Sequence, residues 1–167
     1  MSDPAIRNEA PRCRARVLFL DLDGVLVDSS AVVRRSWSRW ARQGTWAIVT
    51  SGTVPIARTR LQHVGLSEPE VFVTAEDVDR GKPDPQAYER AARLLEVDPG
   101  VGLVFEDSPA GVQAARGAGM RVIGVATTHG AESLAAADWV VASPAEVRVV
   151  AEDDGFSIYE REDGLGR

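Results

Sequence analysis

Six short apolar runs recur along the chain, and segments long enough to form helices separate most of them. The runs are rich in β-branched and aromatic residues and mostly lack polar alternation, which is typical of strands buried on both faces of a parallel sheet. Alternation of such strands with helices predicts an α/β domain, in which flanking helices cover an open, doubly wound parallel sheet. The expected strands are Val17–Leu20, Trp46–Val49, Val71–Val73, Leu103–Phe105, Val122–Val125 and Trp139–Val141.

Helix-start signals lie between these runs. Asp84-Pro85 and Ser108-Pro109 each place a capping residue before a proline, and proline is favoured at the first position of a helix. The expected helices are Ala31–Gln43, about Thr53–Val64, Gln86–Leu95, and one from Pro109 to Gly117 or Gly119.

Two terminal segments frame a core domain that we expect over residues 15–145. Residues 1–14 are polar and predict a flexible arm. Residues 146–167 predict a β-hairpin and tail attached to the core, because Glu146–Glu152 and Phe156–Glu162 flank an Asp-Gly turn at Asp153-Asp154-Gly155. A structural role for this hairpin is favoured over a functional one.

Composition excludes several classes of partner and site. The chain has 167 residues, 44% of them hydrophobic, and a net charge of −6, which disfavours nucleic acid and anionic membranes as partners. Cys13 is the only cysteine, so an internal disulfide and a thiolate zinc site are both excluded. The polar N-terminus and the lack of an apolar run of membrane-spanning length favour a cytoplasmic protein.

The first strand runs directly into two acidic residues. In a doubly wound sheet, ligands bind outside the carboxyl ends of the strands, so polar residues at these ends are candidate functional groups. Asp21 and Asp23 are two positions apart, and on an extended segment they project to the same side. One carboxylate can then attack while the other transfers a proton, although a turn that merely ends the strand would show the same pattern.

Three further motifs follow other strands. Thr50-Ser51-Gly52 supplies hydroxyl groups and precedes a helix whose N-terminal amides could hold a phosphate. Lys82 precedes the helix that begins near Asp84-Pro85, although a single lysine is commonly a solvated surface charge. Glu106-Asp107-Ser108 follows the fourth strand, and two adjacent acids there need a partner if they are buried, unless they serve as a helix cap.

Charge balance then predicts a metal ion. Asp21, Asp23, Glu106 and Asp107 bring four negative charges, Lys82 supplies one positive charge, and a phosphate adds about two more negative charges. Such a site needs a divalent cation, and ligands that are all oxygen select a hard one such as Mg²⁺.

The four motifs, in this order at successive strand ends, resemble the haloacid dehalogenase-like (HAD) hydrolase superfamily. The resemblance runs from Val17 to about Ser143. The segments Asp21–Ser29 and Val104–Gly111 are most similar to sugar- and polyol-phosphate phosphatases and to β-phosphoglucomutase-like members. This implies a HAD-like, Rossmannoid form of the predicted sheet.

The resemblance also implies catalytic roles. Asp21 would attack phosphorus and form an aspartyl-phosphate, and Asp23 would protonate the leaving oxygen and then activate water. Ser51, or Thr50, would hold the phosphoryl oxygens together with Lys82, which would also steady Asp21.

The implied metal site uses the acidic residues of both strand ends. Asp107 would bind Mg²⁺ beside Asp21 and the Asp23 carbonyl, with Glu106 supporting the metal shell. The implied activity is hydrolysis of small phosphorylated metabolites, such as sugar or polyol phosphates.

One departure from the family is large. Members with this signature normally carry a helical cap between the first motif and the second strand, and this cap closes the site and selects the substrate. Here Ser30–Gln43 alone separates Asp28-Ser29 from Gly44-Thr45-Trp46, so the cap domain is missing or deleted. Without a lid we expect weak substrate discrimination, unless a partner subunit in an oligomer covers the open site.

The missing cap also ranks the alternative functions. A phosphomutase must shelter its aspartyl-phosphate from water, so a phosphatase is favoured over a β-phosphoglucomutase-like enzyme. A cap-less domain that binds or scaffolds with little turnover is a second alternative. A receiver-type phospho-acceptor is a third, disfavoured because receivers place the accepting aspartate on a middle strand.

Overall fold

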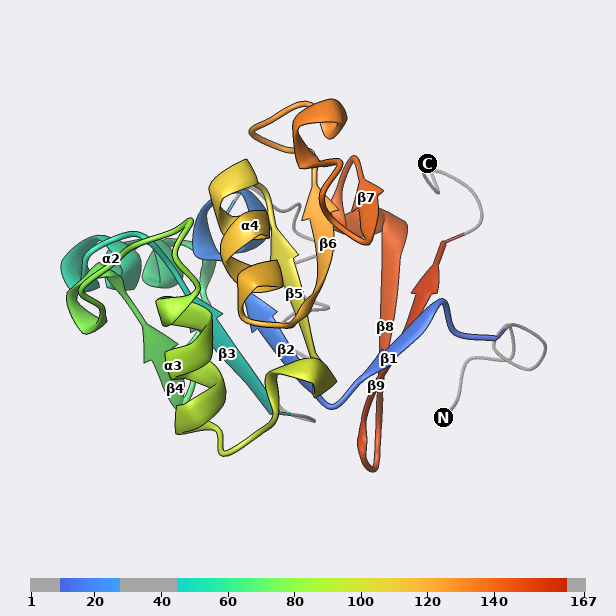
Figure 1. Cartoon of the computed structure of the whole chain (residues 1–167), viewed down its shortest axis with the longest axis horizontal. Coiled ribbons are helices and arrows are strands. Elements are labelled where there is room, and N and C mark those ends of the chain that lie inside the picture. The colour runs from blue at the N-terminus through green and yellow to red at the C-terminus, as the bar shows by residue number, and fades with distance from the viewer. Residues whose placement is uncertain (1–9, 28–44, 162–167) are drawn as a thin grey trace.

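The computed structural model describes residues 10–27 and 45–161, and a six-stranded parallel sheet lies at its centre (Figure 1). The strand order is β4-β3-β2-β5-β6-β7. Each predicted strand is confirmed to within one residue at either end. The strands are β2 (Val17–Leu20), β3 (Thr45–Val49), β4 (Val71–Val73), β5 (Gly102–Glu106), β6 (Arg121–Val125) and β7 (Trp139–Val141).

Three helices flank this sheet in the described ranges: α2 (Val54–Val64), α3 (Gln86–Leu94) and α4 (Pro109–Gly117). The cap predicted at Ser108 is confirmed, since its hydroxyl accepts a hydrogen bond of 3.0 Å from the Gly111 N–H. At α3 the capping position is Pro85, although the Asp84 carboxylate still accepts from the Gln86 N–H. The helix expected over Ala31–Gln43 lies outside the described residues. None of the described helices is long and apolar enough to cross a membrane.

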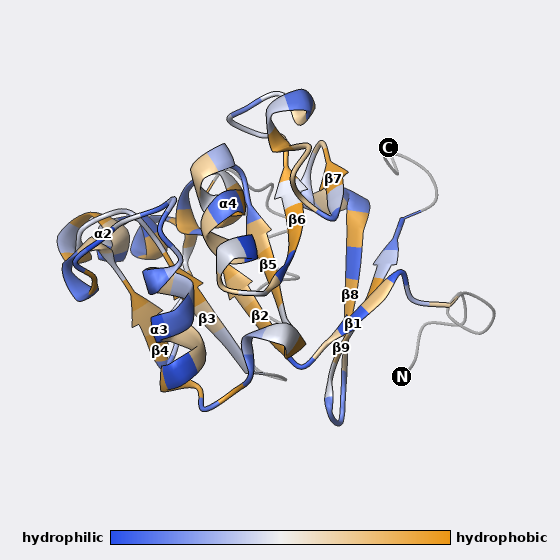
Figure 2. Ribbon diagram, viewed as in Figure 1, coloured by the Kyte–Doolittle hydropathy of each residue, from blue (hydrophilic) through white to orange (hydrophobic). Residues whose placement is uncertain are grey.

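Each face of the sheet has its own hydrophobic core. On one face the strands pack against α3 and α4 through small side chains such as Ala91 and Ala115, together with the larger Tyr88. On the other face they pack against Ala57 and Leu61 of α2. The strands are accordingly apolar along most of their length, whereas the outer face of α3 is polar (Figure 2). A doubly wound α/β domain is therefore confirmed.

A second, antiparallel sheet in the order β1-β9-β8 joins the two ends of the chain. Its strands are β1 (Cys13–Ala15), β8 (Val147–Glu152) and β9 (Gly155–Glu160), and the β8–β9 pair is the predicted hairpin. The flexible arm predicted over residues 1–14 is wrong at its C-terminal end. Cys13 and Arg14 lie in β1, and the Arg12 N–H donates to the Ile158 carbonyl over 2.7 Å.

The three-stranded sheet contributes directly to the core. Its inward side chains lie in the same hydrophobic cluster as Phe105, Ile123 and Val141 of the parallel sheet. It therefore covers part of the face on which α2 packs, a task that helices perform elsewhere in the fold. The inward residues are Ala15, Val147, Val149, Phe156 and Ile158.

We predict that Ile158→Ala lowers the free energy of unfolding by about 2–5 kcal/mol, because it leaves a cavity in this core. Ile158 is fully buried. Urea denaturation measures the change, and Leu94→Ala is the control, since Leu94 is 53% exposed. Equal stability of the two variants would show that the three-stranded sheet does not stabilise the domain.

Candidate active site

Asp21 and the Glu106-Asp107 pair lie at the same edge of the parallel sheet. β2 and β5 are neighbours, with Leu20 opposite Phe105, and the Asp21 N–H extends the pairing by donating to the Phe105 carbonyl over 3.0 Å. The chain order of the strands reverses between β2 and β5, and such switch points are where doubly wound sheets bind ligands.

Hydrogen bonds hold the buried Asp21 carboxylate through both of its oxygens. Oδ1 accepts from the Lys82 ammonium over 2.6 Å, and Oδ2 accepts from the Asp23 N–H over 3.0 Å. The second contact is the local turn that an aspartate forms at the end of a strand. The turn interpretation of Asp21 is therefore confirmed, and the same carboxylate also faces the buried Lys82 ammonium. The role of Asp21 as a nucleophile stays a prediction.

Lys82 is buried rather than a surface charge. Its ammonium donates to Asp21 Oδ1, to the Val49 carbonyl over 3.0 Å and to Glu106 Oε1. These contacts use the three N–H donors that a lysine has. Burial alone would lower the pKa of Lys82, but the carboxylates of Asp21 and Glu106 outweigh it and raise the pKa above its usual value. Lys82 therefore stays charged.

Glu106 is fully buried, and donors surround its carboxylate. Besides Lys82, the Tyr88 hydroxyl donates to Oε1 over 2.7 Å, and the Ser108 N–H and hydroxyl donate to Oε2 over 3.3 and 3.1 Å. The sequence analysis did not identify Tyr88 as a site residue, because an aromatic residue on the apolar face of a helix is typical of the hydrophobic core. Gly111 leaves room for this arrangement, since a Cβ there would lie 1.9 Å from the Glu106 carboxyl carbon.

Asp107 is held from the end of β6. Its Oδ2 accepts from the Thr128 hydroxyl, and its backbone carbonyl lies 3.0 Å from His129 Nδ1. The adjacent Thr127 hydroxyl donates to the Gly24 carbonyl over 2.6 Å. These residues were also missed, although polar groups soon after a predicted strand are the signal that identified Asp21 and Glu106-Asp107.

The buried acids form a compact cluster. Asp21, Glu106 and Asp107 each offer a carboxylate oxygen, and these oxygens lie within 4.8 Å of one another. The cluster contains three carboxyl groups but only the Lys82 ammonium as a buried positive charge, so it carries excess negative charge when the acids are ionised. Burial raises the pKa of Asp21 to about 7. The Glu106 carboxylate raises this pKa further, whereas the Lys82 ammonium opposes the rise. A hard divalent cation such as Mg²⁺ fits this oxygen donor set and would offset the excess.

Asp23 lies at the margin of the cluster. Its side chain is 44% exposed and forms an ion pair with Arg60 of α2, which is 41% exposed. The Asp23 carboxylate does not belong to the cluster of Asp21, Glu106 and Asp107. The prediction that its backbone carbonyl binds the metal stays a prediction.

The hydroxyl motif after β3 places its two hydroxyl residues differently. Thr50 is buried at the end of the strand, and its Oγ1 accepts from the Gly52 N–H over 3.0 Å. Ser51 is exposed. Of the two alternatives for a phosphate-binding hydroxyl, Thr50 is the one that lies inside the edge of the sheet.

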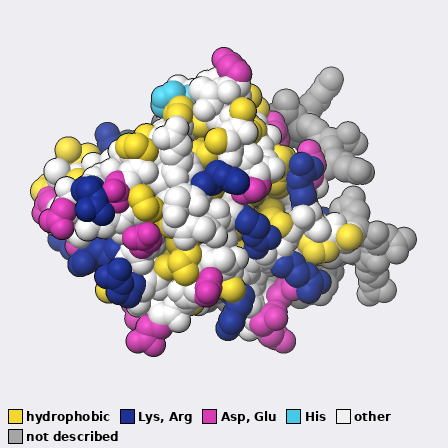
Figure 3. Space-filling view, in the orientation of Figure 1, with side chains coloured by type: hydrophobic (Ala, Val, Ile, Leu, Met, Phe, Trp, Pro, Cys, Tyr) yellow, Lys and Arg dark blue, Asp and Glu magenta, His cyan; other side chains and the backbone are white. Residues whose placement is uncertain are grey.

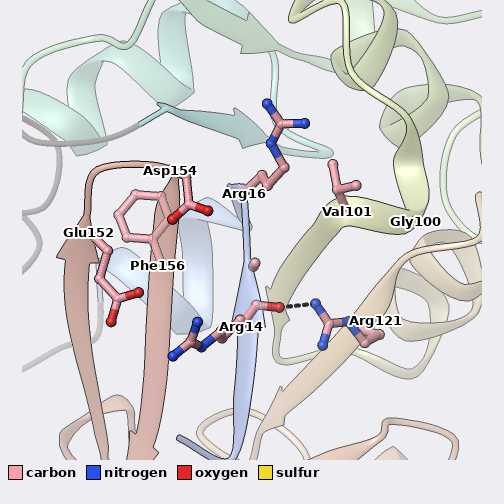
Figure 4. A pocket seen from close by; sticks show the side chains of 9 residues that line it. Arg14, Arg16, Gly100, Val101, Arg121, Glu152, Asp154 and Phe156 are labelled. Atoms are coloured by element: carbon pink, nitrogen blue, oxygen red, sulfur yellow. Dashed lines mark hydrogen bonds between the residues drawn. The ribbon is translucent and has the colours of Figure 1, made fainter.

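A pocket of about 270 Å³ lies at the end of the sheet opposite the acidic cluster, where the three-stranded sheet meets the beginnings of β2 and β6 (Figure 4). Three arginines line it, but their guanidinium groups point in different directions, and that of Arg121 donates to the Arg14 carbonyl. Acidic side chains line it too, including Glu152 and Asp154. This pocket lacks the convergent groups of the carboxyl edge.

Comparison with known proteins agrees with this geometry. A model of haloacid dehalogenase-like hydrolases matches residues 38–119. Hexitol phosphatase A of Escherichia coli strain K12 is 32% identical over 215 residues, and the alignment covers 88% of this chain and 100% of that protein. The chain belongs to the haloacid dehalogenase-like hydrolase family.

Two further comparisons concern a second relative in sequence and a solved structure with the same fold. Validoxylamine A 7'-phosphate phosphatase of Streptomyces hygroscopicus subsp. limoneus is 47% identical over 102 residues, which cover 60% of this chain and 48% of that protein. The chain thus spans about half the length of that relative. A HAD family hydrolase from Deinococcus radiodurans has the same fold, with a TM-score of 0.67, 22% identity and coverage of 83% of this chain and 94% of that one.

The alignment with hexitol phosphatase A also bears on the missing cap. It runs over 215 residues, whereas this HAD chain has 167. Part of that relative therefore has no counterpart here, as the missing insertion predicts. The short connection predicted in place of the cap, Ser30–Gln43, lies outside the described residues.

We predict that Gly111→Ala destabilises the protein, although alanine is favoured over glycine inside a helix by about 1 kcal/mol. The added Cβ would overlap the Glu106 carboxyl group and displace it from Lys82. Gly117→Ala in the same helix is the matched control, because a Cβ there would meet Pro85 at an ordinary 3.4 Å. Thermal unfolding measures both variants, and a stabilised Gly111→Ala protein would contradict the close approach of Glu106.

Proposed function

We propose that this chain is a Mg²⁺-dependent phosphatase that hydrolyses small phosphate monoesters through an aspartyl-phosphate on Asp21. One observation carries the proposal: the Asp21 carboxylate is buried, fixed by Lys82, and within reach of the Asp107 carboxylate. A buried carboxylate with a fixed orientation is suited to nucleophilic attack, because its position is set before the substrate arrives.

In the first step an Asp21 oxygen attacks the phosphorus atom, and the bond from phosphorus to the ester oxygen breaks. Asp23 gives its proton to this leaving oxygen, so the alcohol departs neutral. The exposed position of Asp23 supports this role, since the leaving alcohol must lie on the solvent side of the phosphoryl group. Lys82 steadies Asp21 and supplies positive charge beside the phosphoryl group.

In the second step Asp23, now ionised, removes a proton from water, whose oxygen attacks the aspartyl-phosphate. The bond between phosphorus and the Asp21 oxygen breaks, which releases inorganic phosphate and restores the Asp21 carboxylate. Both carboxyl groups thus return to their starting protonation states.

A bound divalent cation would neutralise phosphoryl charge and favour the ionised form of Asp21. Asp21 and Asp107 are the carboxylates that would hold it, together with the Asp23 carbonyl. Glu106 belongs to the same cluster, but each of its oxygens already accepts from two donors, whereas each Asp21 oxygen accepts from one. We therefore assign Glu106 to support of the metal shell through Lys82, rather than to direct coordination.

The phosphoryl oxygens would be bound at the end of β3. Thr50 and Gly52 lie there, just before α2. The first amides of α2 contribute little, because the Val54 N–H already donates to Glu76 Oε1 and Pro55 has no N–H. Ser51 remains a candidate because its exposed hydroxyl borders the same turn. Lys82 contributes the positive charge.

Sugar and polyol phosphates are the proposed substrates. The relatives named as hexitol and validoxylamine 7'-phosphate phosphatases act on small phosphorylated compounds of this kind. Because residues 28–44 are too few for a cap bundle, we expect broad specificity. Nucleic acid is not a proposed substrate: on the face in Figure 3, basic and acidic side chains are interspersed, without a broad basic surface.

We predict that the protein hydrolyses p-nitrophenyl phosphate in Mg²⁺, and that excess EDTA abolishes turnover. Asp21→Asn should lower kcat by about 10³-fold or more, because it removes the nucleophile. Release of p-nitrophenol measures the rate. Asp153→Asn is the matched control, since it makes the same change in an exposed hairpin turn.

Other outcomes would identify the alternatives. Turnover by the wild-type protein no faster than by folded Asp21→Asn would refute the phosphatase and favour a binding or scaffold domain. A stable phosphoprotein formed from acetyl phosphate would favour a receiver-type acceptor. Transfer of phosphate within a sugar phosphate, without release of inorganic phosphate, would favour a phosphomutase.

A further inference from the structure

The end of β6 adds a group of side chains to the active-site edge that none of the four sequence motifs contains. Thr127, Thr128 and His129 follow this strand after one intervening residue, Ala126. Thr127 contacts the loop after β2 through the Gly24 carbonyl, and the other two contact Asp107 after β5. This segment therefore bridges the two loops that carry the proposed metal ligands.

The direction of each hydrogen bond follows from the chemistry of the groups. The Thr128 hydroxyl lies within reach of two acceptors on Asp107, the carboxylate Oδ2 and, at 3.4 Å, the backbone carbonyl. The contact with Oδ2 is the shorter one, so the single hydroxyl proton is assigned to it. The Asp107 carbonyl can also only accept, so His129 Nδ1 carries a proton when it bonds there over 3.0 Å. The same Nδ1 lies 2.9 Å from Thr128 Oγ1, which has lone pairs free to accept.

The loop after β2 also packs closely against the Asp107 carboxylate. A Cβ on Gly24 would lie 2.0 Å from Asp107 Oδ2, so the backbone of this loop approaches the carboxylate too closely for any other residue. The Thr127 hydroxyl fixes the same Gly24 through its carbonyl. Oδ2 is thus held between Gly24 and Thr128, and the hydroxyl supplies the directional contact that orients it.

We propose that Thr128 is a positioning residue, which holds the Asp107 carboxylate in the orientation that binds the divalent cation. The proposal rests on the function proposed above, because it takes Asp107 as a metal ligand. Partners that orient a metal ligand typically contribute 10- to 100-fold to metal affinity. Loss of the Thr128 hydroxyl should therefore weaken Mg²⁺ binding while the fold is kept.

The test compares three variants with the wild-type protein. Thr128→Val removes the hydroxyl and keeps the shape, whereas Thr128→Ser keeps the hydroxyl. Thr59→Val is the matched control, since the Thr59 hydroxyl donates to the Pro55 carbonyl on exposed α2. Titration calorimetry with MgCl₂ measures affinity, thermal unfolding in EDTA reports on the fold, and kcat is measured across Mg²⁺ concentrations.

We expect Thr128→Val to weaken Mg²⁺ binding about 10-fold or more, and Thr128→Ser to restore most of it. Turnover by Thr128→Val should recover at proportionally higher Mg²⁺, which a general loss of structure would not allow. Thr59→Val should match the wild type. If Thr128→Val does not fold, Thr128→Ala provides the same comparison.

Two results would overturn the proposal, and they can be told apart. If folded Thr128→Val binds Mg²⁺ as tightly as the wild type, Thr128 does not orient the ligand, whereas Mg²⁺-dependent turnover by the wild type still supports the phosphatase. If the wild-type protein itself neither binds Mg²⁺ nor needs it for turnover, both the positioning role and the proposed metal site are refuted.

Discussion

The arrangement of the active-site edge depends on the hydrogen bonds that the Lys82 ammonium donates. Lys82 lies in the loop before α3 and donates to groups at the ends of three neighbouring strands: Asp21, the Val49 carbonyl and Glu106. Removal of one partner from such a buried ion pair typically costs 3–5 kcal/mol, because the remaining charge loses its compensation. Lys82 therefore fixes the relative positions of β2, β3 and β5 as well as the candidate nucleophile.

Close packing around the acids makes their positions specific. Gly24 and Gly111 sit where any larger residue would overlap Asp107 and Glu106, respectively. Tyr88 and Ser108 then saturate Glu106, while Asp107 keeps fewer donors. Two adjacent residues of one strand end thus differ in their surroundings: Glu106 stabilises the buried ammonium, and Asp107 remains available to a cation.

The sequence predicted the parts of the fold that local patterns encode. Strands buried on both faces are nearly continuous apolar runs, and the polar residues that follow them identified Asp21, Lys82 and Asp107. Their convergence depends on strand order, which no local pattern encodes and which the structure gives as β4-β3-β2-β5-β6-β7. The role of Tyr88 could not be recognised, because its hydroxyl donates to Glu106, which lies in another segment of the chain.

Two further errors have the same physical origin. Residues 13 and 14 were assigned to an arm because a strand of three residues has no periodicity to detect, and its partner, β9, lies far along the chain. Thr128 was overlooked although it lies soon after a predicted strand, because hydroxyl residues are common in turns. Its contact with Asp107 becomes visible only in the folded structure. Long-range pairing determines both positions.

The pairing of β1 with β9 has a consequence for synthesis of the protein. Cys13 lies opposite Ile158, so one of the first described strands is completed by the last. A ribosome can release every strand of the parallel sheet while one face of that sheet still lacks Phe156 and Ile158. The nascent chain must therefore carry uncovered apolar surface until β9 leaves the exit tunnel, a stage at which chaperones that bind such surface would be expected to act.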